Sequence, residues 1–225
     1  MAEQPYIPDR RPIASRETAA SKRLASWLAR RGVRPNTISV AGMIAGIVAG
    51  GAFAATAWLE PAWLFFVAAA GLIQLRLLAN MLDGMVAVQT RQASPIGELF
   101  NEVPDRVSDA AILIGAGYAS GAVPELGYLA ACVALFVAYV RAEGKVAGAA
   151  QEFCGPMAKP QRMFVATVAA LYCGLTPRGW QPSIPEYADL GVMAAALAVI
   201  VVGGLWTAMR RLGRIARYLR QAEGV

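Results

Sequence analysis

Histidine is absent from the 225-residue chain, and cysteine occurs only at Cys132, Cys154 and Cys173. An odd number of widely spaced cysteines does not make a disulfide framework. Without histidine or a paired-cysteine spacing, the sequence also lacks the usual ligands of a zinc site. Disulfide-stapled folds, zinc centres and histidine acid–base catalysis are therefore excluded.

Charged residues are also scarce, at 16% of the chain against about a quarter in ordinary soluble domains. Hydrophobic residues make up 57%, and they recur in runs that leave no stretch for a second, soluble domain. The net charge of +6 arises from basic residues at the ends of these runs rather than from one stripe, which argues against nucleic-acid binding. We predict one integral membrane domain.

Six charge-free runs mark the expected membrane spans. Residues 35–59 and 190–209 are each long enough for a bilayer core that needs about 20 residues. Four shorter runs would extend only about 23 Å as helices across a core of roughly 30 Å. These four are residues 61–75, 110–124, 126–140 and 163–177. Each short span must therefore continue into its charged neighbours.

A basic segment precedes the first run, and Leu24, Trp27, Leu28 and Val33 in it have the spacing of one helix face. We expect an interfacial helix on the inner leaflet, with a solvated helix as the alternative. The predicted fold is all-α and integral to the membrane, with six transmembrane helices preceded by this amphipathic helix. The expected parts are a basic segment, the six-helix transmembrane catalytic domain and a basic cytoplasmic tail, at residues 1–34, 35–209 and 210–225.

Basic residues lie almost entirely on one side of the six expected spans, since only Arg178 of the 21 falls on the other. Both termini are therefore expected in the cytoplasm, and short loops without a targeting peptide favour a bacterial inner membrane. Charged inner ends of the short spans then lie at one depth, where they need a shared polar cavity. Snorkelling to the headgroups is the alternative for Arg76, Arg141 and Arg162, but aspartate is too short for it.

Acids and amides recur with helical spacing at two of these inner ends. Asn80 and Asp83 are three residues apart on one, and Asn101, Asp105 and Asp109 are four apart on the next. Each set therefore lies on one helix face. Oxygen donors without His or Cys suit Mg²⁺ or Mn²⁺, which in enzymes usually bridges carboxylates and substrate phosphates. The pattern indicates phosphoryl-group chemistry.

Small residues complete a longer pattern, Asp83-Gly84-x2-Ala87-x9-Gly97-x3-Asn101-x3-Asp105. This pattern resembles the signature of the CDP-alcohol phosphotransferase family, and Pro-Asn-Thr-Ile at residues 35–38 is similar to an entry common in that family. The resemblance covers roughly residues 20–218. It implies a six-helix fold. It also implies an enzyme that transfers a substituted phosphate from a CDP-linked alcohol, often CDP-diacylglycerol, to a hydroxyl acceptor with release of CMP.

The resemblance also implies roles for individual residues. Asp83 is expected to bind metal and Asp105 to be the general base, although Pro104 also suits a helix start with Asp105 as its N-terminal carboxylate. The nucleotide-binding positions are Asp83, Gly84, Ala87 and Gly97. The expected ligands of Mg²⁺ or Mn²⁺ are Asn80, Asp83, Asn101, Asp105 and Asp109.

Three positions depart from the family pattern. Asn80 and Asn101 stand where the family has aspartates, and Val88 stands where it has an arginine. Because asparagine offers an oxygen but no charge, one metal or weaker metal binding is expected. The candidates to replace the missing acid are Asp109, Glu102 and Glu98. The candidates to replace the missing guanidinium are Arg91, Arg106 and Arg76.

Basic residues at the next two inner ends are candidates for binding the phosphate of the acceptor or of the lipid, with positive-inside anchoring as the alternative. They are Arg141, Lys145, Lys159 and Arg162. The acceptor stays open among glycerol phosphate, inositol or its phosphate, serine and another alcohol. The resemblance also implies a homodimer.

The leading hypothesis is a membrane CDP-alcohol phosphotransferase of phospholipid biosynthesis that uses CDP-diacylglycerol. The alternative is a catalytically impaired member of the same family, because Asn80, Asn101 and Val88 depart from its pattern, which would act as a lipid-binding or partner subunit. A transporter is disfavoured, because the acids cluster at one depth and the chain has no internal repeat.

Overall fold

The computed structural model describes residues 14–92, 94–184 and 190–223. Within these ranges the regular structure is helical, apart from a single bridge between Ile184 and Leu190. The elements are η1 (Ala14–Glu17), α1 (Ala19–Arg30), α2 (Pro35–Ala55), α3 (Ala62–Gln89), α4 (Pro95–Gly117), α5 (Pro124–Val146), α6 (Lys159–Leu175), η2 (Arg178–Trp180) and α7 (Val192–Glu223).

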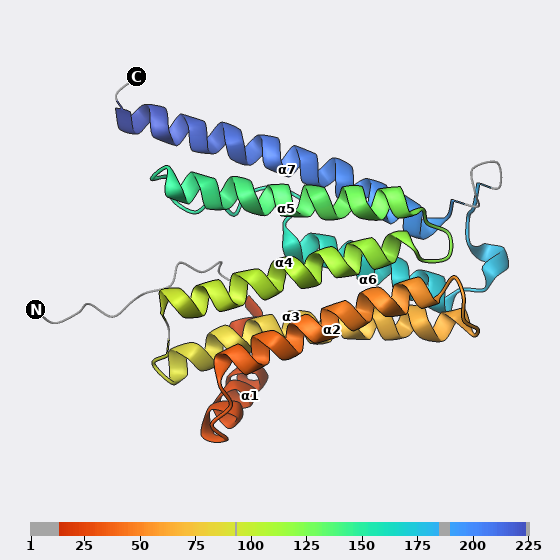
Figure 1. The fold of residues 1–225 in the computed structure, drawn as a ribbon, viewed down its shortest axis with the longest axis horizontal. Helices are drawn as coiled ribbons and strands as arrows, with labels where there is room; N and C mark the ends of the chain where they lie inside the picture. Colours follow the sequence, from red (N-terminus) through yellow and green to blue (C-terminus); the bar gives the residue numbers. More distant parts are fainter. Residues whose placement is uncertain (1–13, 93, 185–189, 224–225) are drawn as a thin grey trace, which may run out of the picture.

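Helices α2 to α7 lie side by side along the long axis of the molecule, and α1 lies across one end of this bundle (Figure 1). The end of α7 is at the same end of the bundle as α1, whereas η2 and the loop between α2 and α3 are at the other. At that end the Arg178 guanidinium pairs with the Glu60 carboxylate at 2.6 Å. The backbone N–H of Ala62 also donates a hydrogen bond to this carboxylate, and the two hydrogen bonds, that from Ala62 first, lower the pKa of Glu60. The predicted separation of Arg178 from the other basic residues is therefore seen in the fold.

Each of the six predicted spans lies mainly in one of the helices α2 to α7, although the span at 110–124 runs past the end of α4 at Gly117. Four of them, α2, α3, α5 and α7, are long and apolar enough to cross a membrane. Helix α4 is not among them because its first half is charged, and α6 has only 17 residues. The short runs do continue into charged neighbours, since α3 extends to Gln89 and α4 begins at Pro95. The protein is an integral membrane protein with several helical spans.

The two ends of the chain also form helices. Helix α1 begins after Thr18, whose side chain accepts a hydrogen bond from the backbone of Ser21, and it packs on α3 through Ala25. The amphipathic helix expected before the first span is therefore present. Helix α7 continues without a break through the predicted tail to Glu223.

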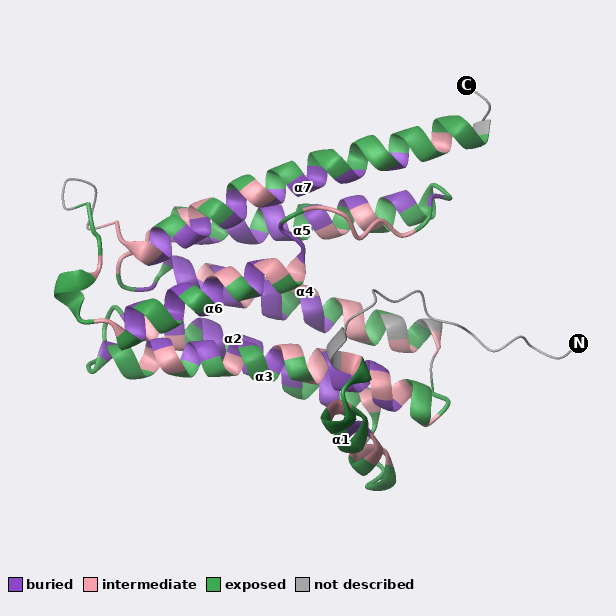
Figure 2. Ribbon diagram, turned by 180° about the vertical axis from the view of Figure 1, so that it is seen from behind, coloured by how far each residue is buried: buried purple, intermediate pink, exposed green. Residues whose placement is uncertain are grey.

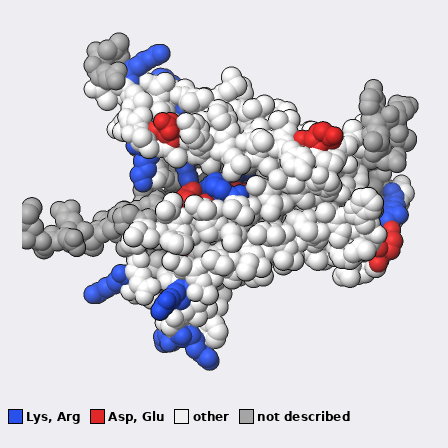
Figure 3. Space-filling model, viewed as in Figure 1, with Lys and Arg blue, Asp and Glu red and all other residues white. Residues whose placement is uncertain are grey.

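The bundle has an apolar core, but its outer surface differs from that of a soluble protein. Several charged side chains lie among the buried residues of the bundle, while large apolar side chains such as Phe164 and Val202 are exposed on its outside (Figure 2). The flank of the bundle seen in Figure 3 is mostly uncharged, and charged groups gather at its ends. Such an apolar outer surface is expected where lipid is the solvent.

Glycines on one face of α2 allow α4 to approach closely. A side chain at Gly46 would collide with Ser108, and one at Gly50 would collide with the backbone of Ala111. Small residues at a helix interface allow this kind of close packing in membranes. The close packing also places the start of α2 beside the polar parts of α3 and α4.

Gly50→Ala is therefore expected to destabilise the bundle, because the new methyl group meets the backbone of Ala111 and forces α2 and α4 apart. Overpacking of this kind typically costs about 1–3 kcal/mol. The neighbouring Gly51 has open space around it, so Gly51→Ala is a matched control. Thermal melting in detergent should show a lower midpoint for Gly50→Ala alone, and equal midpoints would contradict this account of the packing.

Candidate active site

A cavity of about 750 Å³ opens between the helices, on the side of the bundle where α3 ends and α4 begins. Figure 3 shows acidic and basic groups at the bottom of a hollow in a largely uncharged surface. This is the two-signed polar cavity that the charged span ends predict. The predicted site residues that line it are Asn80, Asp83, Gly84, Ala87, Gly97, Asn101, Asp105, Arg141, Lys159 and Arg162.

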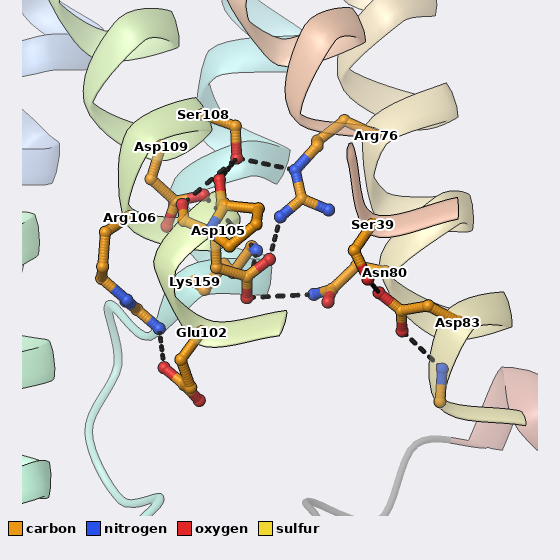
Figure 4. A network of polar contacts seen from close by, with 12 residues as sticks. Ser39, Arg76, Asn80, Asp83, Glu102, Asp105, Arg106, Ser108, Asp109 and Lys159 are labelled. Carbon is orange, nitrogen blue, oxygen red and sulfur yellow. Dashed lines mark hydrogen bonds and ion pairs between the residues drawn. The ribbon is translucent and has the colours of Figure 1, made fainter. Parts of the chain in front are cut away.

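Asp105 is held between two cations. Arg76 from α3 binds one carboxylate oxygen, and the Lys159 ammonium from α6 lies 2.7 Å from the other (Figure 4). Arg76 is itself oriented by Ser108, whose hydroxyl accepts a hydrogen bond from its Nε at 2.7 Å. Since α4 begins at Pro95, Asp105 lies well inside the helix, and the alternative of an N-terminal carboxylate is wrong.

Asp109 lies one turn further along α4 and is almost fully buried. It pairs with Arg162 at 3.2 Å and with Lys159 at 3.5 Å. Arg162, also buried, donates a second hydrogen bond to the carbonyl of Met157. Asp109 does not line the cavity although its partner Arg162 does, so this acid reaches the site through its cationic partners.

Asp83 faces the cavity from α3 and is held from α2. The Ser39 hydroxyl donates to one carboxylate oxygen at 2.7 Å, and the backbone N–H of Gly84 donates to the other. Sequence reasoning missed both Ser39 and Ser108. Only the position of Ser39, one turn after the Pro-Asn entry of the first span, could have indicated it.

Asn80 connects these groups. In the orientation of its amide that satisfies both ends, the nitrogen donates to Asp105 at 3.2 Å and to Asn101 at 2.9 Å. The amide oxygen then accepts from Lys159 at 3.2 Å. The two asparagines are therefore part of the same polar network as Asp105.

Glu102 forms a second cluster in the wall of the cavity. It pairs with Arg106 at 2.6 Å and with Arg141 at 2.7 Å, and the Arg141 guanidinium lies 5.7 Å from the centre of the Phe153 ring. Of the candidates for the missing acid and guanidinium, Glu102 and Arg106 line the cavity. Arg91, Arg76 and Lys145 are outside its lining, and the side chain of Glu98 lies outside the described residues.

The oxygen donors of the cavity differ in how far they are already engaged. Among the described residues no group of three or more His, Cys, Asp or Glu side chains is arranged to hold a metal. Asp105 is already paired with two cations, whereas Asp83 has no ion pair within 4 Å among the described residues. Asp83 is therefore the remaining carboxylate that could hold a divalent metal ion, and Mg²⁺ commonly binds one or two carboxylates plus substrate phosphates.

Comparison with known proteins identifies the relatives of this chain. No family model matches it. The phosphatidylinositol phosphate synthase of Streptomyces avermitilis is 30% identical over 208 residues, which cover 88% of this chain and 79% of that protein. The archaetidylinositol phosphate synthase of Aeropyrum pernix is also 30% identical over 208 residues, covering 91% of this chain and 94% of that protein.

Solved structures share the fold. The phosphatidylinositol phosphate synthase of Mycobacterium tuberculosis in complex with manganese and citrate matches with a TM-score of 0.70 at 18% identity, over 87% of this chain and 88% of its own. The same enzyme with CDP-DAG bound matches with a TM-score of 0.67 at 17% identity, over 88% of this chain and 94% of its own. With the relatives at 30% identity, this likeness shows that the chain belongs to the CDP-alcohol phosphatidyltransferase family, whose members are integral-membrane enzymes of phospholipid biosynthesis.

Proposed function

We propose that this protein transfers the phosphatidyl group of CDP-diacylglycerol to a hydroxyl of an inositol phosphate, with release of CMP. The observation that carries the proposal is the cavity, which Asp105 and the Asp83-Gly84 part of α3 line together with the cationic side chains of Arg106, Arg141 and Lys159. Two relatives at 30% identity are named as synthases of inositol phosphate lipids. A solved structure with the same fold has CDP-DAG bound.

In the proposed reaction the acceptor oxygen forms a bond to the phosphatidyl phosphorus, and the bond from that phosphorus to the CMP oxygen breaks. CMP leaves with the electron pair of the broken bond. The acceptor proton passes to the Asp105 carboxylate, which Arg76 holds in orientation. Positioning and charge neutralisation provide most of the catalysis in such transfers.

The remaining cavity residues bind the substrates. Gly84, Ala87 and Gly97 leave room for the cytidine nucleotide against the backbone. A Mg²⁺ or Mn²⁺ ion held by Asp83 would neutralise charge on the diphosphate. The lipid chains would lie in the surrounding membrane, because the outside of the bundle is apolar.

Arg141 and Arg106 are the proposed partners of the acceptor's phosphate, since Glu102 holds both in the cavity wall. Arg162 is committed to Asp109 and has little exposed surface, so its proposed role is support. We propose that α4 and α6 cross the membrane with the other four helices, and that the cavity opens to the cytoplasm at the basic end of the bundle.

CMP release by the purified full chain in liposomes tests this function. The assay supplies CDP-diacylglycerol, Mg²⁺ or Mn²⁺, and one acceptor at a time from inositol phosphate, inositol, glycerol phosphate and serine. We expect metal-dependent CMP release that is fastest with inositol phosphate. If no acceptor supports release while CDP-diacylglycerol still raises the melting temperature, the protein is instead a lipid-binding or partner subunit of the same fold.

A further inference from the structure

We propose that the ammonium group of Lys159 is a built-in cation that takes the place of a second divalent metal ion, so that this site holds no more than one. The inference rests on the proposed function, and it assigns to Lys159 a role different from binding the acceptor's phosphate. It follows from where the side chain lies, from the charges around it and from the two asparagines beside it.

The position of Lys159 is that of an ion among oxygen ligands. Its Nζ lies 2.7 Å from Asp105, 3.5 Å from Asp109 and 3.2 Å from the amide oxygen of Asn80. The side chain is only 15% exposed, so these oxygens rather than water surround much of the charge. A divalent ion bound to Asp105 would have to displace this ammonium or lie in direct contact with it.

The start of α6 holds this ammonium in place. Lys159 is the first residue of α6, and Pro160 follows it at a position that suits the first turn of a helix. The backbone therefore fixes where the side chain begins. Figure 4 shows Lys159 beneath Asp105, between Asp109 and the side of the cavity formed by Asn80.

Charge balance leaves room for one divalent ion. The three acids at the site, Asp83, Asp105 and Asp109, are matched in formal charge by three bases. These bases are Arg76, Lys159 and Arg162. A diphosphate diester adds one negative charge on each phosphate, which one divalent ion balances. A second ion would add two positive charges beside Lys159 and Arg76 with no acid left to offset them.

The asparagines match this arrangement. Asn80 and Asn101 stand where two more negative charges would favour a second metal ion. The Asn80 amide nitrogen donates to Asn101 and to Asp105, and its oxygen accepts from Lys159. The charge of Lys159 and the neutral amides of the asparagines therefore have the same effect: a fixed monovalent cation replaces an exchangeable divalent ion.

Counting bound Mn²⁺ by electron paramagnetic resonance, with the full chain in detergent and CDP-diacylglycerol present, tests the proposal. We expect no more than one Mn²⁺ per chain in the wild type and in Asn80→Asp/Asn101→Asp, which keeps Lys159. Adding Lys159→Met to that double variant should allow a second Mn²⁺ and the spin coupling of two nearby ions. Adding Lys145→Met instead is the matched control and should not.

Two Mn²⁺ ions bound by the wild type, or by the double aspartate variant with Lys159 intact, would overturn the proposal. A triple variant with Lys159→Met that melts normally but binds no additional Mn²⁺ would overturn it as well. Ion counting does not depend on turnover, so the result is separate from the proposed function. A chain that binds one Mn²⁺ but releases no CMP would contradict the proposed transferase function and leave the role of Lys159 standing.

Discussion

Asp105→Asn is expected to lower the rate of CMP release by about 10²–10⁴-fold, the usual contribution of a positioned general base. Asparagine has nearly the same shape and can still accept the hydrogen bond from Arg76, but it cannot take the acceptor proton. Because Arg76 remains bonded to Ser108, the cavity should keep its form. The measurement is initial CMP release in liposomes at saturating CDP-diacylglycerol.

Two comparisons make the result specific to Asp105. Glu125→Gln removes an exposed carboxylate from the start of α5, far from the cavity lining, and should leave the rate unchanged. Binding of CDP-diacylglycerol, followed by its effect on the melting temperature, should persist in Asp105→Asn. A well-folded Asp105→Asn protein that turns over at the wild-type rate would show that another group accepts the proton.

Arg162→Met is expected to destabilise the folded protein by about 3–5 kcal/mol, because it leaves a buried carboxylate without its principal partner. The carboxylate is that of Asp109, which is 1% exposed and pairs with Arg162 at 3.2 Å. Because Lys159 remains 3.5 Å from the Asp109 carboxylate, the expected loss of stability lies toward the lower end of this range. Thermal and denaturant unfolding in detergent measure the effect.

The double variant Arg162→Met/Asp109→Leu separates the cost of an unpaired charge from that of lost packing. Replacing a buried ion pair by apolar residues of similar volume is often neutral, so the double variant should recover much of the stability. Arg178→Met, which breaks the exposed pair with Glu60, should have little effect. A single variant as stable as the wild type, or a double variant no better than the single, would contradict this role for the pair.

Sequence reasoning located the helices, and it selected residues that line one cavity, where the signal was local. The charge-free runs located α2 to α7, because a bilayer selects apolar residues over a whole span. Helical spacing grouped Asn80 with Asp83 and Asn101 with Asp105, and both groups line one cavity. The family resemblance, confirmed by relatives at 30% identity, was carried by the same spacing.

Partner choice was not accessible to that reasoning. Arg162 and Lys159 were predicted to bind a substrate phosphate, yet the structure pairs them with Asp109 and Asp105. These partners are more than fifty positions apart in the sequence. Which cation pairs with which acid depends on how α4 is rotated and shifted along its axis relative to α6. The sequence pattern of a single helix predicts neither quantity.

By itself the sequence determined that the protein is helical, lies in the membrane and gathers polar groups at the charged ends of its apolar runs, because hydropathy and helical periodicity act over neighbouring residues. Only the tertiary structure decided that Ser39 holds Asp83, that Arg76 and Lys159 share Asp105, and that a lysine stands among the expected metal ligands. The physical reason is that ion pairs and hydrogen bonds act over a few ångströms, so they form only where packing brings distant helices into register.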